Sequence, residues 1–168
     1  MTTFTAVRRE RVGRMVIHGA PETVFPLLCP MREYDWIDVW DCRMVYTGSG
    51  VAELDCVFST DFPHHGGEET WVVSRYAPPE AIEFIRFSPG EKVVRLAVTL
   101  APSAPDRTTL TWRKVFTGLS AAGNHFIEAA AGDAFDMEVA RIETLLNHYL
   151  DTGTMLTGTV PHAPQPIH

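Results

Sequence analysis

The chain has 168 residues and a formal net charge of −7, with 45% hydrophobic and 21% charged residues. This length and balance are typical of one soluble globular domain. An acidic chain without a basic stripe is a poor candidate for nucleic-acid binding, which depends on neutralising phosphates. No apolar run reaches the roughly 20 residues of a membrane span. Residues 1–10 also lack an apolar signal-peptide core. We therefore expect a single cytoplasmic domain.

Cysteine and histidine spacings give no sign of a disulfide framework or a metal site. Cys29, Cys42 and Cys56 are odd in number and fit no C-x-x-C pattern, so we expect reduced thiols. The adjacent His64 and His65 precede two glycines, which predicts the end of a hairpin. We expect neither a metal ion nor a cofactor.

The first elements are a strand and two short helices. Residues 4–18 mix β-branched and charged side chains, which favours a strand. In the segment 20–28, Pro21 suits the first position of a helix, and Pro26 should keep that helix short. Residues 31–38 could form a second short helix.

From residue 42 the pattern changes to strand-like runs separated by turn residues. Turn signals recur every 8–14 residues with short loops between them, which is typical of an antiparallel meander. The expected strands are 42–47, 52–62, 69–76, 81–87, 92–100 and 107–117.

Residues 119–150 contain no proline and carry an apolar stripe at helical spacing, which predicts one long helix. Ser120 could cap its start, and Gly123 and Gly132 mark points where it could bend. The segment 154–168 has three prolines and no charged residue, so we expect an extended or disordered tail. The chain is thus divided into a domain over 1–153 and a flexible C-terminal tail.

This order of elements predicts an α+β architecture. A single long helix must bury its apolar stripe against the sheet, which is the only large surface available. A seven-stranded antiparallel sheet curls through its right-handed twist, so it would wrap around the helix and enclose a space. Whether side chains fill that space or leave it open to a ligand decides the function.

The order of elements, the segment Ala20–Leu28 and the C-terminal helix together resemble the START-like (SRPBCC) helix-grip superfamily, nearest its polyketide cyclase/dehydrase-like branch. The segment Cys29–Ile37, continuing to Trp40 and Cys42, is similar to an uncharacterised bacterial subgroup. The resemblance covers residues 4–151. It implies a deep cavity for an apolar or amphipathic small molecule. It implies no particular reaction, because members include lipid carriers, hormone receptors, cyclases and chaperone-ATPase activators.

The residues expected at this cavity come from one unusual segment and from strand alternation. Residues 33–42 hold two tryptophans, one tyrosine, four acids and a cysteine. This favours an aromatic gate at the cavity mouth, or alternatively tryptophans that close one end of a filled core. Alternation over 42–46 and 52–62 places every second residue inward. The expected ligand contacts are Trp36, Trp40, Tyr46, Cys56, Phe58, Trp112, His125 and Tyr149.

Three functions fit these patterns. The leading hypothesis is binding of a lipid-like, aromatic or polyketide-like small molecule in the cavity. The second is a cyclase, dehydratase or aromatase, in which Glu33, His125 and Cys56 would meet in the cavity, with Asp35 and His148 as further acid–base candidates. The third is an interaction module without a ligand. Residues 1–18 carry a net +3 and residues 31–61 a net −5, which could support a homodimer.

Overall fold

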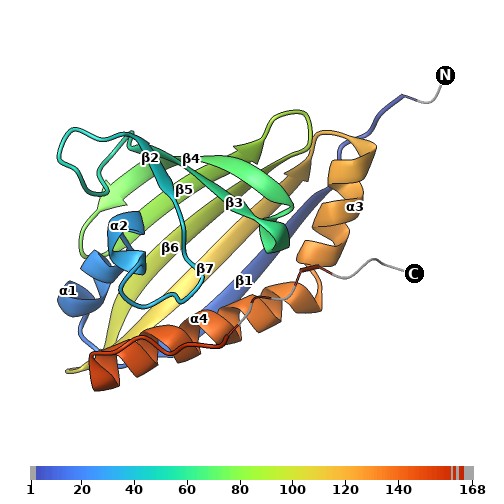
Figure 1. The fold of residues 1–168 in the computed structure, drawn as a ribbon. Coiled ribbons are helices and arrows are strands. Elements are labelled where there is room, and N and C mark those ends of the chain that lie inside the picture. The colour runs from blue at the N-terminus through green and yellow to red at the C-terminus, as the bar shows by residue number, and fades with distance from the viewer. Residues whose placement is uncertain (1–2, 160, 162, 165–168) are drawn as a thin grey trace.

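The computed structural model describes residues 3–159, 161, 163 and 164 (Figure 1). Seven strands form one antiparallel sheet in the order β1-β7-β6-β5-β4-β3-β2. The curved sheet wraps around the C-terminal helix, which confirms the predicted α+β architecture. The strands are β1 (Arg8–Ile17), β2 (Arg43–Tyr46), β3 (Val57–Phe62), β4 (Gly67–Ala77), β5 (Ala81–Ser88), β6 (Lys92–Ala104) and β7 (Arg107–Gly118).

Two short helical segments close one end of the sheet. Helix α1 (Pro21–Val24) begins at Pro21 as predicted and continues into the 3-10 turn η1 (Phe25–Leu28). Helix α2 (Pro30–Glu33) is a single turn and ends earlier than the predicted 31–38. Two indoles then hold the following loop in place, because Trp36 Nε1 donates to the Leu27 carbonyl at 2.9 Å and Trp40 Nε1 donates to that of Pro30 at 2.8 Å.

The long helix predicted over 119–150 is two helices, α3 (Ala121–Ala130) and α4 (Asp133–Thr152). The break falls at Gly132, one of the two predicted bends, whose φ of −86° and ψ of −141° are not helical. Ser120 caps α3 as predicted, since its hydroxyl accepts from the Gly123 amide at 3.1 Å. The break lets α3 pack over the end of β7 while α4 crosses the inner face of the sheet.

The predicted alternation holds in β3 and β7, where the residues expected inward are buried, but not near β2; these buried residues are Phe58, Thr60, Phe62, Leu110, Trp112 and Phe116. Residues 52–56 are not a strand, and a register shift interrupts the β2–β3 pairing between Met44 and Tyr46. The shift changes which face a side chain occupies. Tyr46, which follows the shift, and Leu54, which lies in a turn outside any strand, are exposed at 70% and 55%, although both are predicted inward.

Side chains from α3 and α4 form hydrogen bonds at the two ends of the outer edge of β1. Asn124 accepts from the Val7 amide, Glu143 accepts from that of Val16, and the Asn147 amide group bonds both Val16 and His18. These bonds occupy backbone groups that β1 does not offer to β7. The edge strand is therefore joined to the helices by hydrogen bonds as well as by packing.

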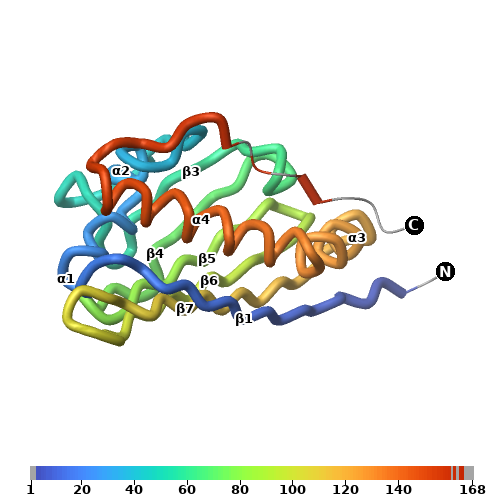
Figure 2. The backbone as a smooth tube through the Cα atoms, turned by 90° about the horizontal axis from the view of Figure 1, so that it is seen from below, coloured from blue at the N-terminus to red at the C-terminus, as the bar shows by residue number. Residues whose placement is uncertain are grey.

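After α4 the chain turns back at Gly153 and runs along that helix toward the 34–40 loop (Figure 2). Asp38 accepts from both the amide and the hydroxyl of Thr159, and Arg141 donates to Asp38 and to the Thr159 carbonyl. Six residues of the predicted tail, 160, 162 and 165–168, lie outside the described residues, and the domain boundary at 153 stays a prediction. In the described ranges, no helix is long and apolar enough to cross a membrane.

Candidate functional site

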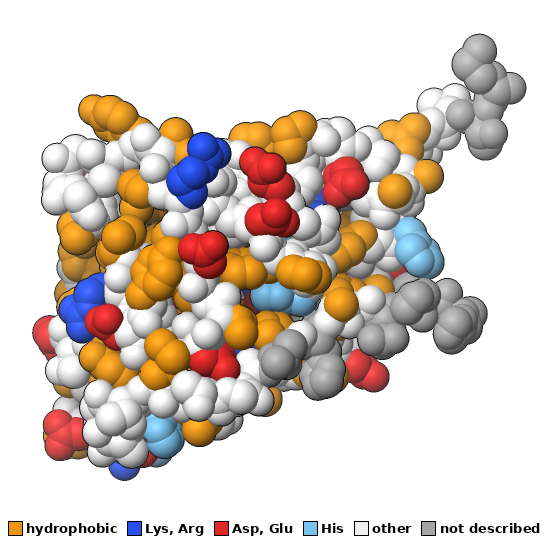
Figure 3. Space-filling model, in the orientation of Figure 1, with side chains coloured by type: hydrophobic (Ala, Val, Ile, Leu, Met, Phe, Trp, Pro, Cys, Tyr) orange, Lys and Arg blue, Asp and Glu red, His pale blue; other side chains and the backbone are white. Residues whose placement is uncertain are grey.

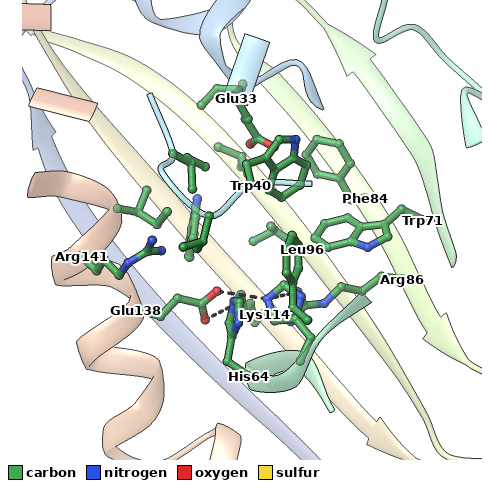
Figure 4. A pocket seen from close by; sticks show the side chains of 18 of the residues that line it. Glu33, Trp40, His64, Trp71, Phe84, Arg86, Leu96, Lys114, Glu138 and Arg141 are labelled. Carbon is green, nitrogen blue, oxygen red and sulfur yellow. Dashed lines mark hydrogen bonds and ion pairs between the residues drawn. The ribbon is translucent and has the colours of Figure 1, made fainter. Parts of the chain in front are cut away.

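A pocket of about 80 Å³ lies between the inner face of the sheet, α4 and the 34–40 loop (Figure 4). We call it the aromatic pocket. A second pocket of about 190 Å³, the outer pocket, adjoins it and reaches α3 and the C-terminal segment at Pro161 and Pro164. In the space-filling view, imidazole atoms are visible in the middle of this face, among hydrophobic side chains (Figure 3). The residues common to both pockets are His64, His65, Arg86, Glu138 and Arg141.

Ring contacts build one wall of the aromatic pocket. The Trp71 ring stacks on Phe58 at 5.2 Å and meets Phe84 edge-on at 5.7 Å. Trp40 approaches the same indole at 6.5 Å. Phe58, Trp71 and Phe84 come from inward positions of the neighbouring strands β3, β4 and β5, whereas Trp40 comes from the loop before β2. Thr60 fixes the Trp71 indole by accepting from its Nε1 at 2.9 Å. The wall is therefore a rigid, largely apolar surface suited to a flat or aliphatic ligand.

At the other end of the pocket, ionisable side chains are buried together. Lys114 donates to Glu138 at 2.6 Å, and His65 lies between Glu138 at 3.7 Å and Glu69 at 3.3 Å. The Arg86 guanidinium lies within 3.3 Å of both ring nitrogens of His65. It also lies 4.9 Å from the Trp71 ring centre. We define the charged cluster as His65, Glu69, Arg86, Lys92, Lys114 and Glu138.

Burial governs the protonation of this cluster. It lowers the pKa of Lys114 to about 8 and that of the neighbouring His64 to about 4. Burial, with Arg86 nearby, also holds the pKa of His65 well below its usual range. Burial alone would raise the pKa of Glu138, but Lys114 and His65 hold it well below the ordinary value. At neutral pH, Lys114 and Glu138 of the cluster are therefore charged. The imidazoles of His65, within the cluster, and of His64, beside it, are neutral.

Some polar atoms of the cluster lack hydrogen bonds within the described residues. Both carboxylate oxygens of Glu69 and the Nε of Arg86 are buried without a hydrogen-bond partner. The nearest opposite charges are 3.7 Å away, between Arg86 and Glu69, and 4.0 Å away, between Lys92 and Glu69. Buried polar groups are nearly always hydrogen-bonded, so a water molecule or a ligand group is expected here.

Glu33 occupies the opposite end of the aromatic pocket, on the last turn of α2 (Figure 4). No described residue hydrogen-bonds its carboxyl group. Burial raises its pKa to about 8, so the group is largely protonated and uncharged at neutral pH. A neutral carboxylic acid among apolar side chains can donate a hydrogen bond or a proton.

The structure divides the predicted ligand contacts into two sets. Trp36, Trp40, Phe58 and Trp112 line the aromatic pocket. The remaining four, Tyr46, Cys56, His125 and Tyr149, do not line either of the two pockets.

Tyr46 is exposed on β2, and the other three residues of the second set lie elsewhere in the fold. Cys56 is buried beside Met44, with its thiol 3.5 Å from the thioether, and Tyr149 packs at the edge of the core. His125 is exposed, because two residues along a helix turn it about 200° from Gly123, which faces the β5–β6 turn at Glu91. The predicted grouping of Glu33, His125 and Cys56 is therefore wrong.

The charged cluster escaped the sequence-based prediction, although strand alternation carries a signal for it. Each of its four strand residues stands two positions from an inward hydrophobic residue, and hence on the same face. The pairs are Glu69 with Trp71, Arg86 with Phe84, Lys92 with Val94, and Lys114 with Trp112. Across the ranges described, no three His, Cys, Asp or Glu side chains are placed to hold a metal ion.

Comparison with known proteins gives structural similarity only. No protein-family model and no curated protein sequence matches the chain. Its structure is similar to a START superfamily protein from Mycobacterium smegmatis (12% identity, 83% of this chain and 97% of that chain, TM-score 0.62). It is also similar to the Zhui aromatase/cyclase from Streptomyces sp. R1128 (11% identity, 89% of this chain and 100% of that chain, TM-score 0.64). A third similar structure is norcoclaurine synthase from Thalictrum flavum (7% identity, 90% of this chain and 100% of that chain, TM-score 0.62). At these identities the similarities show the fold alone, and they confirm the predicted one.

Proposed function

We propose that this protein of the START-like helix-grip fold binds an apolar or amphipathic small molecule, aromatic, polyketide-like or lipid-like, in the aromatic pocket. The observation that carries the proposal is the composition of that pocket, with stacked rings along one wall and buried ionisable groups at one end. Small-molecule sites have this character, being mostly apolar with a few convergent polar groups.

A purely structural core is a poorer explanation of the same residues. Burying charged side chains costs free energy, and hydrophobic residues of similar volume often stabilise a core as well or better. Lys114 and Glu69 are nevertheless almost fully buried, at 1% exposure each. The similar folds include an aromatase/cyclase and a START superfamily protein, which supports a binding role.

The test is a fluorescence titration of the full chain with N-phenylnaphthylamine, an uncharged aromatic probe. We expect saturable binding of one probe per chain. The substitution Leu96→Trp, at an inward position that lines the pocket, should abolish binding by filling the space. Thr99→Trp places the same indole on the exposed face of the same strand and should leave binding intact. Circular dichroism would verify that both variants fold.

Absence of saturable binding by the parent protein would contradict the proposal. The ligand-free interaction module would then be favoured, and its candidate surface is the exposed hydrophobic group near β2, formed by Val45, Tyr46, Val51 and Leu54.

A second candidate function, a dehydratase or cyclase, is favoured by Glu33. Its protonated carboxyl could donate a proton to a departing hydroxyl while a water molecule takes the α-proton, so that an enone and water form. A test substrate is the aldol adduct of benzaldehyde and acetone, whose dehydration to benzylideneacetone is followed by ultraviolet absorbance. Glu33→Gln should abolish any acceleration, whereas Glu22→Gln, an exposed glutamate on α1, should not. Equal rates with and without protein would count against this function for that substrate.

A further inference from the structure

We propose that the polar end of the ligand is an oxyanion, such as a carboxylate, phenolate or enolate, held against Arg86 and Lys114. The inference rests on the proposed function and specifies the chemical class of the ligand. It follows from which charges face the pocket and from which hydrogen-bond donors are free.

Cations outnumber anions on the pocket surface. The side chains of Arg86, Lys114 and Arg141 line the aromatic pocket, and Glu138 is the charged carboxylate among its described lining residues. Glu33, the other acid of this lining, lies at the far end of the pocket and is uncharged. The carboxylates that balance the remaining cations, Glu69 and Asp38, stand behind this surface. A ligand entering the pocket therefore meets positive charge at its inner end.

The hydrogen bonds leave donors unused at the same place. The Lys114 ammonium group has three N–H donors and gives one to Glu138. Arg86 has no carboxylate within hydrogen-bond distance among the described residues, since Glu69 lies 3.7 Å from its Nε. Its guanidinium instead lies against the rings of His65 and Trp71. Both cations can thus donate to an incoming acceptor without breaking an existing bond.

The looser pairing of Arg86 distinguishes it from the other cations of the pocket. Lys114 and Arg141 lie 2.6 Å and 3.2 Å from their carboxylates, Glu138 and Asp38. A guanidinium held among aromatic rings in a low dielectric gains most from an ionised acceptor, because the attraction between opposite charges adds to the hydrogen bonds and a carboxylate can accept two of them. A neutral carbonyl or hydroxyl group would leave this gain unrealised.

Matched probes test the inference in the full chain. Anilinonaphthalene sulfonate and N-phenylnaphthylamine share one ring system and differ by a sulfonate group. Dodecanoate and dodecanol, used as competitors of N-phenylnaphthylamine, form a lipid-like pair that differs mainly in charge. We expect the anion of at least one pair to bind roughly tenfold or more tightly than its neutral partner, as one hydrogen bond to a charged group implies. The pair with the larger difference would indicate an aromatic or a lipid-like ligand.

Variants that remove whole ion pairs locate the effect. Lys114→Met with Glu138→Gln removes one cation and one anion together, so the net charge is unchanged and no buried charge is left alone. We expect this variant to lose at least fivefold in its preference for the anion while still binding the neutral probe. The matched control is Arg113→Met with Glu10→Gln, which removes an exposed pair between β7, the strand of Lys114, and the neighbouring β1. It should keep the full preference.

Arg86→Met with Glu69→Gln gives a second, independent measurement should the first variant fail to fold, and it should show the same loss. Neutral probes that bind as tightly as their anions would overturn the inference and leave the proposed function standing. An anion preference that survives both pair removals would place the anion elsewhere and would also overturn it. Failure of every probe to bind would overturn the proposed function and this inference together.

Discussion

Replacing Glu33 with glutamine should stabilise the protein at neutral pH and leave its stability unchanged in acid. Burial raises the pKa of Glu33 from 4.5 to about 8, and no described residue compensates for its charge. Between these two values the native state keeps the proton and the unfolded state releases it. Stability is therefore fully present below about pH 4.5 and falls as the pH rises toward 8.

The size of the effect follows from the same shift. One pKa unit corresponds to about 1.4 kcal/mol, so a difference of about 2.5 units at pH 7 amounts to at most roughly 3.5 kcal/mol. The side chain is partly exposed, and solvent screening reduces this value. Glutamine has nearly the same shape and no proton to lose, so Glu33→Gln escapes this cost. The variant should match the parent protein near pH 4 and exceed its free energy of unfolding by about 2–3 kcal/mol at pH 7.

Urea denaturation at half-unit steps of pH measures this difference directly. The low pKa values of His64 and His65 reduce stability as the pH falls below 6.5, but both proteins share them, so they cancel in the comparison. Glu22→Gln is the control for losing a carboxylate from an exposed site. A difference between parent and Glu33→Gln that does not vary with pH would refute the argument.

Three further predictions follow from packing. Gly123→Ala should destabilise the protein by about 1–3 kcal/mol, because a Cβ there would lie 1.8 Å from the Glu91 carbonyl oxygen, and thermal unfolding would measure the loss. Trp71→Ala should cost about 3–5 kcal/mol in urea denaturation, since a nearly buried ring that contacts four others would be lost; a cost below 1 kcal/mol would contradict the described wall. Arg141→Ala should loosen the segment after α4, because it removes the bonds of Arg141 to Asp38 and to the Thr159 carbonyl and leaves only those between Thr159 and Asp38. Limited proteolysis should cleave that segment faster than in the parent protein, and equal cleavage would contradict this.

Most of the fold was predictable from hydrophobic periodicity and from the positions of turn residues. The meander was predictable because proline, glycine and short polar runs separate its strands, and local sequence decides where such turns fall. The division between α3 and α4 was less accessible. Gly132 permits a break, but the packing of α3 over β7 decides that it occurs, and that contact is not local.

The site was predictable only in its apolar half. Trp36, Trp40, Phe58 and Trp112 were expected at the pocket from their residue type and alternation. Lys114 was missed, because a lysine in a strand is usually solvated, and only its place between inward neighbours signals burial. Its partner Glu138 comes from a helix 24 positions further along the chain, a pairing that no local pattern encodes.

The hydrogen bonds between the helices and the outer edge of β1 have a consequence for assembly. Strand edges with free amide and carbonyl groups invite a second chain to extend the sheet. Here Asn124, Glu143 and Asn147 already occupy backbone groups along that edge. The opposite edge is β2, only four residues long and interrupted by a register shift. Edge pairing is thus hindered at the two ends of β1 and at β2. The homodimer that the uneven charge distribution led us to expect stays a prediction, and if those charges hold it together, salt would weaken it.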